Sequence, residues 1–63
     1  MTAPASISIP DLETVYDHLA TAIDRAGPQK TELFLVKLAL LNANALGDAG
    51  LFLQNIHAAL QDL

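Results

Sequence analysis

The stretch "LLNANALGD", residues 40–48, joins the most apolar segment of the chain to the segment that follows it. Its leucines and alanines favour a helix. Gly47 is typical of a residue that ends a helix with a positive φ, and Asp48 directly after it is a favourable N-cap for another helix. We therefore predict a tight connection between two helices, with Asn44, Gly47 and Asp48 as its structural turn residues.

The helix that ends at this connection is predicted to span residues 29–46. Lys30, Lys37 and Asn44 are spaced by seven, so they form one narrow polar strip along it. The rest of its circumference is apolar, and a helix of that kind is expected to be buried against other helices. Two apolar sides are expected to be covered by the rest of the chain. One consists of Leu33, Val36, Leu40 and Ala43, and the other of Leu35, Leu38 and Leu46.

The two asparagines of this helix are predicted to differ in environment. Successive positions turn by about 100°, so Asn42 and Asn44 project to different sides. Asn44 joins the polar strip and is predicted to be exposed, whereas Asn42 lies among leucines and is predicted to be buried. A buried amide without a partner costs about 1–3 kcal/mol. The partner of Asn42 is either a backbone group of a loop or Asn42 of a second chain across a two-fold axis.

Two further helices flank the apolar one. "SIPDLETVYDHLATAIDRAGP", residues 8–28, has apolar residues at helical spacing on one face and polar residues on the other. This helix starts either with Ser8 as N-cap or with Pro10 as its first residue, and Gly27 ends it. The third helix follows Asp48 and runs to the end of the chain. These helices predict an all-α fold, a three-helix up-down-up antiparallel bundle over residues 10–63 that follows an N-terminal arm, residues 1–9.

Composition predicts that this bundle associates with another chain. The 63 residues allow one domain, of which 52% of residues are hydrophobic and 16% are charged. So small a domain is marginal alone and usually needs a disulfide, a metal or a partner. There is no cysteine and there are only two histidines, which leaves oligomerisation. We expect a homodimer that pairs through the second helix. Its candidate interface residues are Phe34, Leu38, Leu41, Asn42 and Ala45.

Charge excludes two classes of partner. The net charge is −4, with only three basic residues, so no basic patch for nucleic acid or an anionic membrane surface is expected. The N-terminal residues lack the positive charge and the apolar core of a signal peptide. The longest apolar run is shorter than the roughly 20 residues of a membrane span. We expect a cytoplasmic protein.

The polar residues predict neither a catalytic site nor a metal or cofactor site. Thr14 and His18 pair a hydroxyl with a base at helical spacing, but no oxyanion donors accompany them. The acidic residues of the first helix share its polar face without a Glu-x-x-His motif. They are Glu13, Asp17 and Asp24. A solvated polar face is the expectation for both groups, and His57 is interpreted as a surface histidine. We therefore expect no catalytic residue, no metal ligand and no cofactor.

"LALLNANALGD", residues 38–48, resembles a family of short bacterial proteins classed as domain of unknown function DUF2783. The shared pattern is a leucine-rich helix that ends in Ala-Asn, two further residues and Gly-Asp. A similar first helix lies around "TVYDHLATAID", residues 14–24, so the resemblance covers the chain from about residue 10. This chain departs from the pattern at Asn42, where an apolar residue is expected. The resemblance implies a bacterial cytoplasmic protein and no particular activity.

Together these features predict a non-enzymatic interaction module. It would self-associate and serve as an accessory to an unidentified larger protein. The alternative is a small helical bundle that binds an apolar ligand between its helices. Stabilisation by a small molecule would favour the alternative, whereas co-purification with a defined protein would favour the interaction module.

Overall fold

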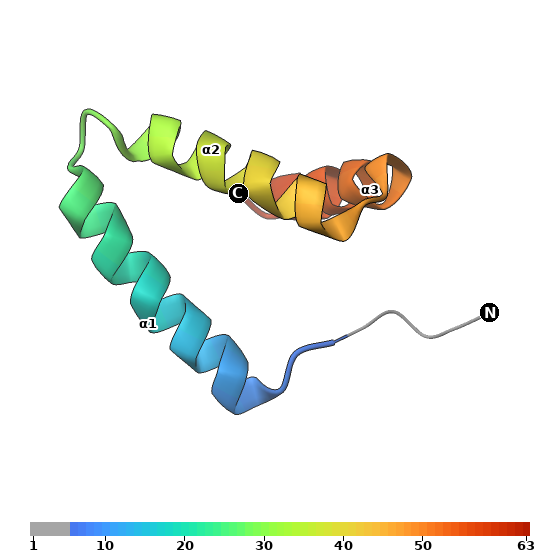
Figure 1. Cartoon of the computed structure of the whole chain (residues 1–63), viewed down its shortest axis with the longest axis horizontal. Coiled ribbons are helices and arrows are strands. Elements are labelled where there is room, and N and C mark those ends of the chain that lie inside the picture. Colours follow the sequence, from blue (N-terminus) through green and yellow to red (C-terminus); the bar gives the residue numbers. More distant parts are fainter. Residues whose placement is uncertain (1–5) are drawn as a thin grey trace. The chain divides into compact units, whose positions relative to one another are not determined.

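The structure is a computed structural model that describes residues 6–63, and this part of the chain is all-α. Its helices are α1 (Ile9–Ala26), α2 (Thr31–Leu46) and α3 (Ala49–Leu60) (Figure 1). The predicted all-α class with three helices is confirmed. Part of the predicted arm, residues 1–5, lies outside the described residues. The chain divides into two units, one ending with Thr31 and the other formed by Glu32–Leu63.

Helix α1 begins at a serine cap. The Ser8 hydroxyl accepts a hydrogen bond from the backbone N–H of Asp11 at 3.2 Å, and the backbone of Ser8 is extended. This confirms Ser8 as the N-cap, the first of the two predicted starts, so Ile9 already belongs to the helix. Pro10 follows in the first turn, where its missing N–H breaks no helical hydrogen bond.

The turn after α1 is closed by the carbonyl of Gly27. This oxygen accepts the backbone N–H of Lys30 at 3.0 Å and the hydroxyl of Thr31 at 2.8 Å. Gly27 has φ 79° and ψ 161°, a conformation that is open essentially to glycine alone. Because residues 28–30 form this turn, α2 begins at Thr31 and the predicted start at residue 29 is wrong. Lys30 therefore lies outside α2, and the predicted polar strip keeps only Lys37 and Asn44.

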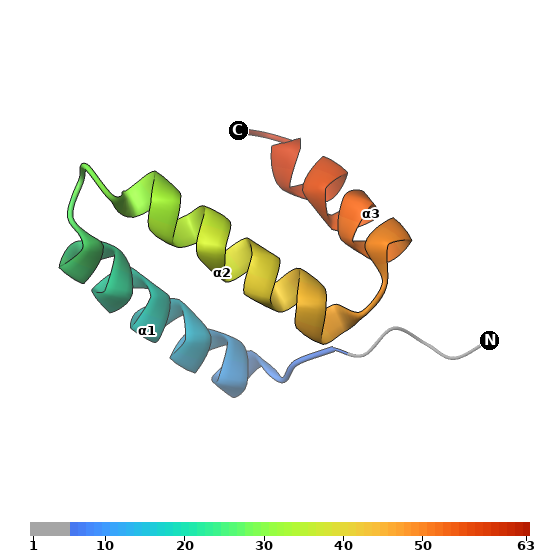
Figure 2. The same cartoon turned by 45° about the horizontal axis from the view of Figure 1, so that its top comes forward.

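At the connection between α2 and α3, Gly47 and Asp48 act as the sequence predicts, whereas Asn44 lies within α2. Gly47 has φ 70°, and its N–H donates to the carbonyl of Ala43 at 3.0 Å. The Asp48 carboxylate accepts the N–H of Leu51 at 3.0 Å and so caps α3. Helix α3 then runs back along α2 in the opposite direction (Figure 2). It ends at Leu60 rather than at the end of the chain.

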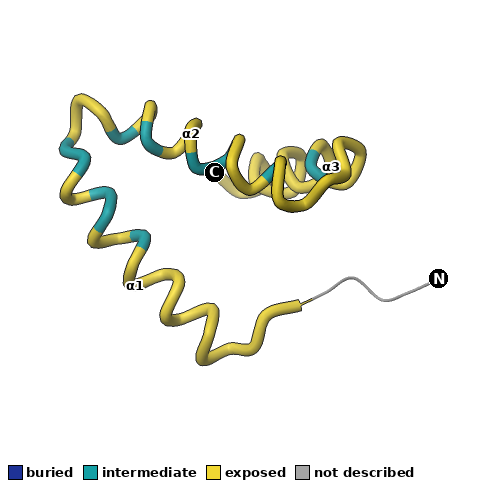
Figure 3. The backbone as a smooth tube through the Cα atoms, viewed as in Figure 1, coloured by how far each residue is buried: buried dark blue, intermediate teal, exposed yellow. Residues whose placement is uncertain are grey.

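None of the described residues is buried (Figure 3). Half-buried residues occur on all three helices, and sixteen large hydrophobic side chains in the described chain are exposed. The half-buried helical residues are Leu19, Ala22, Ile23, Ala26, Thr31, Phe34, Leu38, Ala39, Ala43 and Phe52. Burial of apolar surface is the dominant favourable term in folding. A single chain that buries this little gains little of that free energy, and further burial would stabilise it.

Candidate interaction surface

One side of α2 presents a row of apolar side chains, three of which are exposed. Leu33, Val36 and Leu40 are 60%, 49% and 64% exposed, and the half-buried Ala43 continues the row. Their spacing of three, four and three residues places them on one face of the helix. We call Leu33, Val36, Leu40 and Ala43 the α2 stripe. The prediction that this side is covered is wrong for α3, the other helix of the same unit.

The reason lies in how little α3 shields. Among the residues of α3, Phe52 alone is half-buried. The other large apolar side chains of α3 are exposed. For Leu53, Ile56 and Leu60 the exposed fractions are 57%, 43% and 58%. The predicted apolar face of α3 is therefore largely exposed as well. A helix of 12 residues that turns back along α2 leaves both its own face and the α2 stripe uncovered.

The predicted interface residues on α2 do not form one open surface. Phe34 and Leu38 are already half-buried within the chain, whereas Leu41 is 66% exposed and Ala45 is exposed. Leu41 lines an open depression on the surface of α2. The depression is lined by Lys37, Leu40, Leu41 and Asn44. The open surface of α2 therefore runs from Leu41 past Lys37 and Asn44 to Leu40 of the α2 stripe.

Asn42 is exposed in the single chain, so the prediction that the chain itself buries it is wrong. Pairing with Asn42 of a second copy stays a prediction. The prediction relied on its leucine neighbours, but Leu35 and Leu46 are themselves 38% and 41% exposed. Those side chains do not enclose the amide, so water can satisfy it. Asn44 is exposed, as predicted, and lies in the last turn of α2 before Gly47.

The threonine hydroxyl groups of α1 are hydrogen-bonded to the helix backbone. Thr14 donates to the carbonyl of Pro10 and Thr21 to that of Asp17, each at 3.1 Å. The Thr14 hydroxyl proton is thus directed to the preceding turn and not to His18. The exposed face of α1 carries Glu13, Asp17 and Asp24, and one open depression on it is lined by Asp17, His18, Thr21, Ala22 and Arg25. Residues 6–63 contain no group of three or more His, Cys, Asp or Glu side chains that could hold a metal ion.

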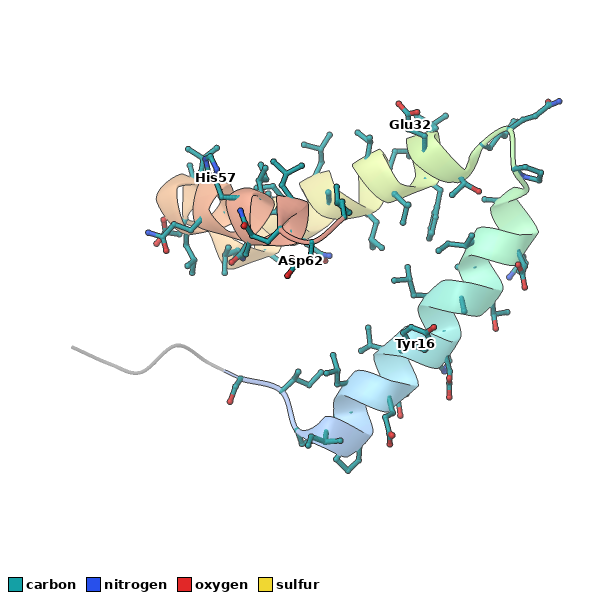
Figure 4. The ribbon with its side chains drawn as sticks, turned by 180° about the vertical axis from the view of Figure 1, so that it is seen from behind. Tyr16, Glu32, His57 and Asp62 are labelled. Atoms are coloured by element: carbon teal, nitrogen blue, oxygen red, sulfur yellow. The ribbon has the colours of Figure 1, made fainter. Side chains whose placement is uncertain are left out.

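One further side chain of α1 and one of α3 are also open to solvent. Tyr16 of α1, on the helix face that the sequence pattern marks as apolar, is 71% exposed (Figure 4). His57 of α3 is exposed, as expected from the sequence. The Gln61 amide donates to the backbone carbonyl of His57 at 3.4 Å. This hydrogen bond is made at the C-terminal end of α3 and does not involve the imidazole.

No family model, curated protein or solved structure matches the chain. Within the described residues, every helix is too short or too polar to cross a membrane.

Proposed function

We propose that this protein is a non-enzymatic helical module that works by self-association through α2. The observation that carries the proposal is the absence of any buried residue between residues 6 and 63, together with the sixteen exposed large hydrophobic side chains. A monomer of this size is marginal even when it buries most of its apolar residues. Association with a second copy supplies the missing cover.

The position of the open surface favours association over ligand binding. Contiguous exposed apolar patches on soluble proteins mark interaction surfaces. The α2 stripe is such a patch, and the open face of α3 belongs to the same unit of the chain. The depressions on α1 and α2 described above are open, and each is lined by residues of a single helix. A second copy is the simplest occupant, because a two-fold axis covers the same patch on both chains.

The module's wider role in this proposal is that of an accessory to a larger protein in a bacterial cytoplasm. The resemblance of residues 38–48 to short bacterial proteins supports the setting. The exposed charged residues of α1 support the accessory role. In this proposal α2 is occupied by the second copy, and the polar face of α1 stays in water.

Sedimentation equilibrium at micromolar concentration tests the proposal. We expect an average mass above the single-chain mass that falls toward it on dilution. A single-chain mass at every concentration, with cooperative unfolding, would overturn it. In that case, a rise in melting temperature with an apolar small molecule would favour the ligand-binding alternative.

A further inference from the structure

We propose that two copies pair through the α2 stripe with their α2 helices parallel and in register, so that Glu32 of each copy faces Lys37 of the other. This inference rests on the proposed function, since it names the face and the direction of the self-association. It differs from the sequence-based interface around Phe34 and Leu41, which lies on other sides of the same helix.

The α2 stripe has the geometry of a helix-pairing surface. Leu33, Val36, Leu40 and Ala43 follow the three-and-four spacing of the a and d positions in a heptad. The first three are open, and the small Ala43 at the end allows a neighbouring helix to come close. Phe34 and Leu38, which fall outside these positions, are the large apolar residues of α2 that the chain itself half-buries. The chain's own packing therefore leaves Leu33, Val36 and Leu40 of the pairing face open, whereas Ala43 is already half-buried.

The two charges of α2 flank this face on opposite sides. Glu32 and Lys37 are the only charged residues of the helix, and both are exposed. With Leu33 at position a, Glu32 occupies position g and Lys37 the following position e. These are the positions that carry salt bridges between paired helices. Figure 4 shows Glu32 projecting from the first turn of α2.

The signs of these charges select the parallel direction. In a parallel in-register pair, position g of one helix faces the following position e of the other, which brings Glu32 to Lys37 twice by symmetry. In an antiparallel pair, positions e face each other and positions g face each other. Lys37 would then approach Lys37 of the other copy, and Glu32 would lie near the apolar Ala39 or Leu46. Like charges at an interface disfavour that arrangement.

Charge reversal in two separate chains tests the pairing. Glu32→Lys gives a chain whose facing positions are both positive, and Lys37→Glu gives one whose facing positions are both negative. We expect each variant alone to self-associate about tenfold more weakly than the wild type at low salt. Mixing the two variants should restore association, because each then faces its opposite. Local effects on the helix are the same before and after mixing, so the recovery reports the contact between copies, and it should shrink in about 1 M salt.

Disulfide trapping tests the direction independently, because the chain has no cysteine of its own. In the parallel pair, Leu33 lies beside Leu33 of the other copy, within reach of a disulfide. In an antiparallel pair, Leu33 lies beside Ala43 of the other copy. The two Leu33 residues are then about 15 Å apart along the helix axis. We expect Leu33→Cys alone to form a covalent dimer under mild oxidation. The matched mixture of Leu33→Cys and Ala43→Cys should give no mixed product above the level of random collision.

The outcomes separate this inference from the proposed function. Recovery on mixing together with the Leu33→Cys dimer supports the parallel pair. If the wild-type protein self-associates but the cysteine variants form only the mixed disulfide, the parallel pair is overturned and self-association stands. The same holds if the charge variants associate as the wild type does. A wild-type protein that stays a single chain overturns both.

Discussion

Helices α1 and α2 are of similar length but differ in how their charged and apolar residues are distributed. Helix α1 has 18 residues and five charged side chains, so one face suits water and the other suits an apolar partner. Helix α2 has 16 residues and two charged side chains, with leucines around most of its circumference. Yet both helices expose large hydrophobic residues. The difference shows that α1 can stay at a surface, whereas α2 needs cover on more than one side, which is why we assign self-association to α2.

The largest effect is expected from a charge placed in the α2 stripe. Leu40→Glu would bury a carboxylate between two copies, which is costly without a partner. We expect self-association to weaken by roughly 30-fold or more, the effect of losing a central interface residue. Leu41→Glu is the matched control, because Leu41 is equally exposed, at 66% against 64%, on another side of the helix. It should change the dissociation constant by no more than about threefold.

Sedimentation velocity of both variants over a concentration series provides the measurement. A larger loss for Leu41→Glu than for Leu40→Glu would return the interface to the side that the sequence suggested.

The next largest effect is expected on the free energy of unfolding, and it differs between the turn at Gly27 and the turn at Gly47. Gly27→Ala forces an alanine into a conformation reserved for glycine, and should lower the free energy of unfolding by about 1–3 kcal/mol. Gly47→Ala should cost less, about 1 kcal/mol, because φ 70° is strained but accessible. Neither added methyl group would meet another atom within 4 Å, so the cost is conformational. Chemical denaturation measures both. Equal and negligible effects would show that neither turn needs its positive φ.

Helix caps give a smaller effect that compares α1 with α3. Asp48→Ala removes the side chain that accepts the N–H of Leu51 and should cost about 1 kcal/mol. Ser8→Ala removes the corresponding bond to Asp11, which is longer at 3.2 Å and involves no charge. It should cost about 0.5 kcal/mol. Asp48→Asn is the control, since it keeps the acceptor. A cost for Asp48→Asn as large as for Asp48→Ala would assign the effect to charge and not to the cap.

The smallest effect is expected at the two asparagines. Both are exposed, so Asn42→Asp and Asn44→Asp should each change the free energy of unfolding by less than about 0.5 kcal/mol. Thermal and chemical unfolding of the two variants side by side measure the difference. Strong destabilisation by Asn42→Asp alone would mean that Asn42 becomes buried in the assembled protein.

The ends of α1 and α2 and the start of α3 could be predicted from the sequence, and the start of α1 was limited to two alternatives, because each depends on atoms a few residues apart. Ser8 and Asp48 accept hydrogen bonds three residues ahead, and Gly47 supplies the positive φ that its position requires. The start of α2 was missed because the hydroxyl of Thr31 and the N–H of Lys30 close a turn on Gly27 that no periodic pattern signals. Such local bonds are strong but short in range.

Which side of α2 stays open could not be predicted in the same way. Leu33 and Leu38 are equally apolar, yet Leu33 is 60% exposed and Leu38 is half-buried. The signal that was present is the heptad spacing of the α2 stripe with Glu32 and Lys37 beside it. Asn42 shows the same limit, because apolar neighbours in the sequence did not enclose it.

The central claim is that the apolar cover missing from one chain comes from a second copy. Its most direct test is the melting temperature of the wild-type protein, followed by circular dichroism over a dilution series of about a hundredfold. If pairing and folding are coupled, the melting temperature falls steadily with dilution, and Leu40→Glu melts lower than Leu41→Glu at every concentration. A melting temperature that is independent of dilution, in a species that sediments as a single chain, would contradict the claim.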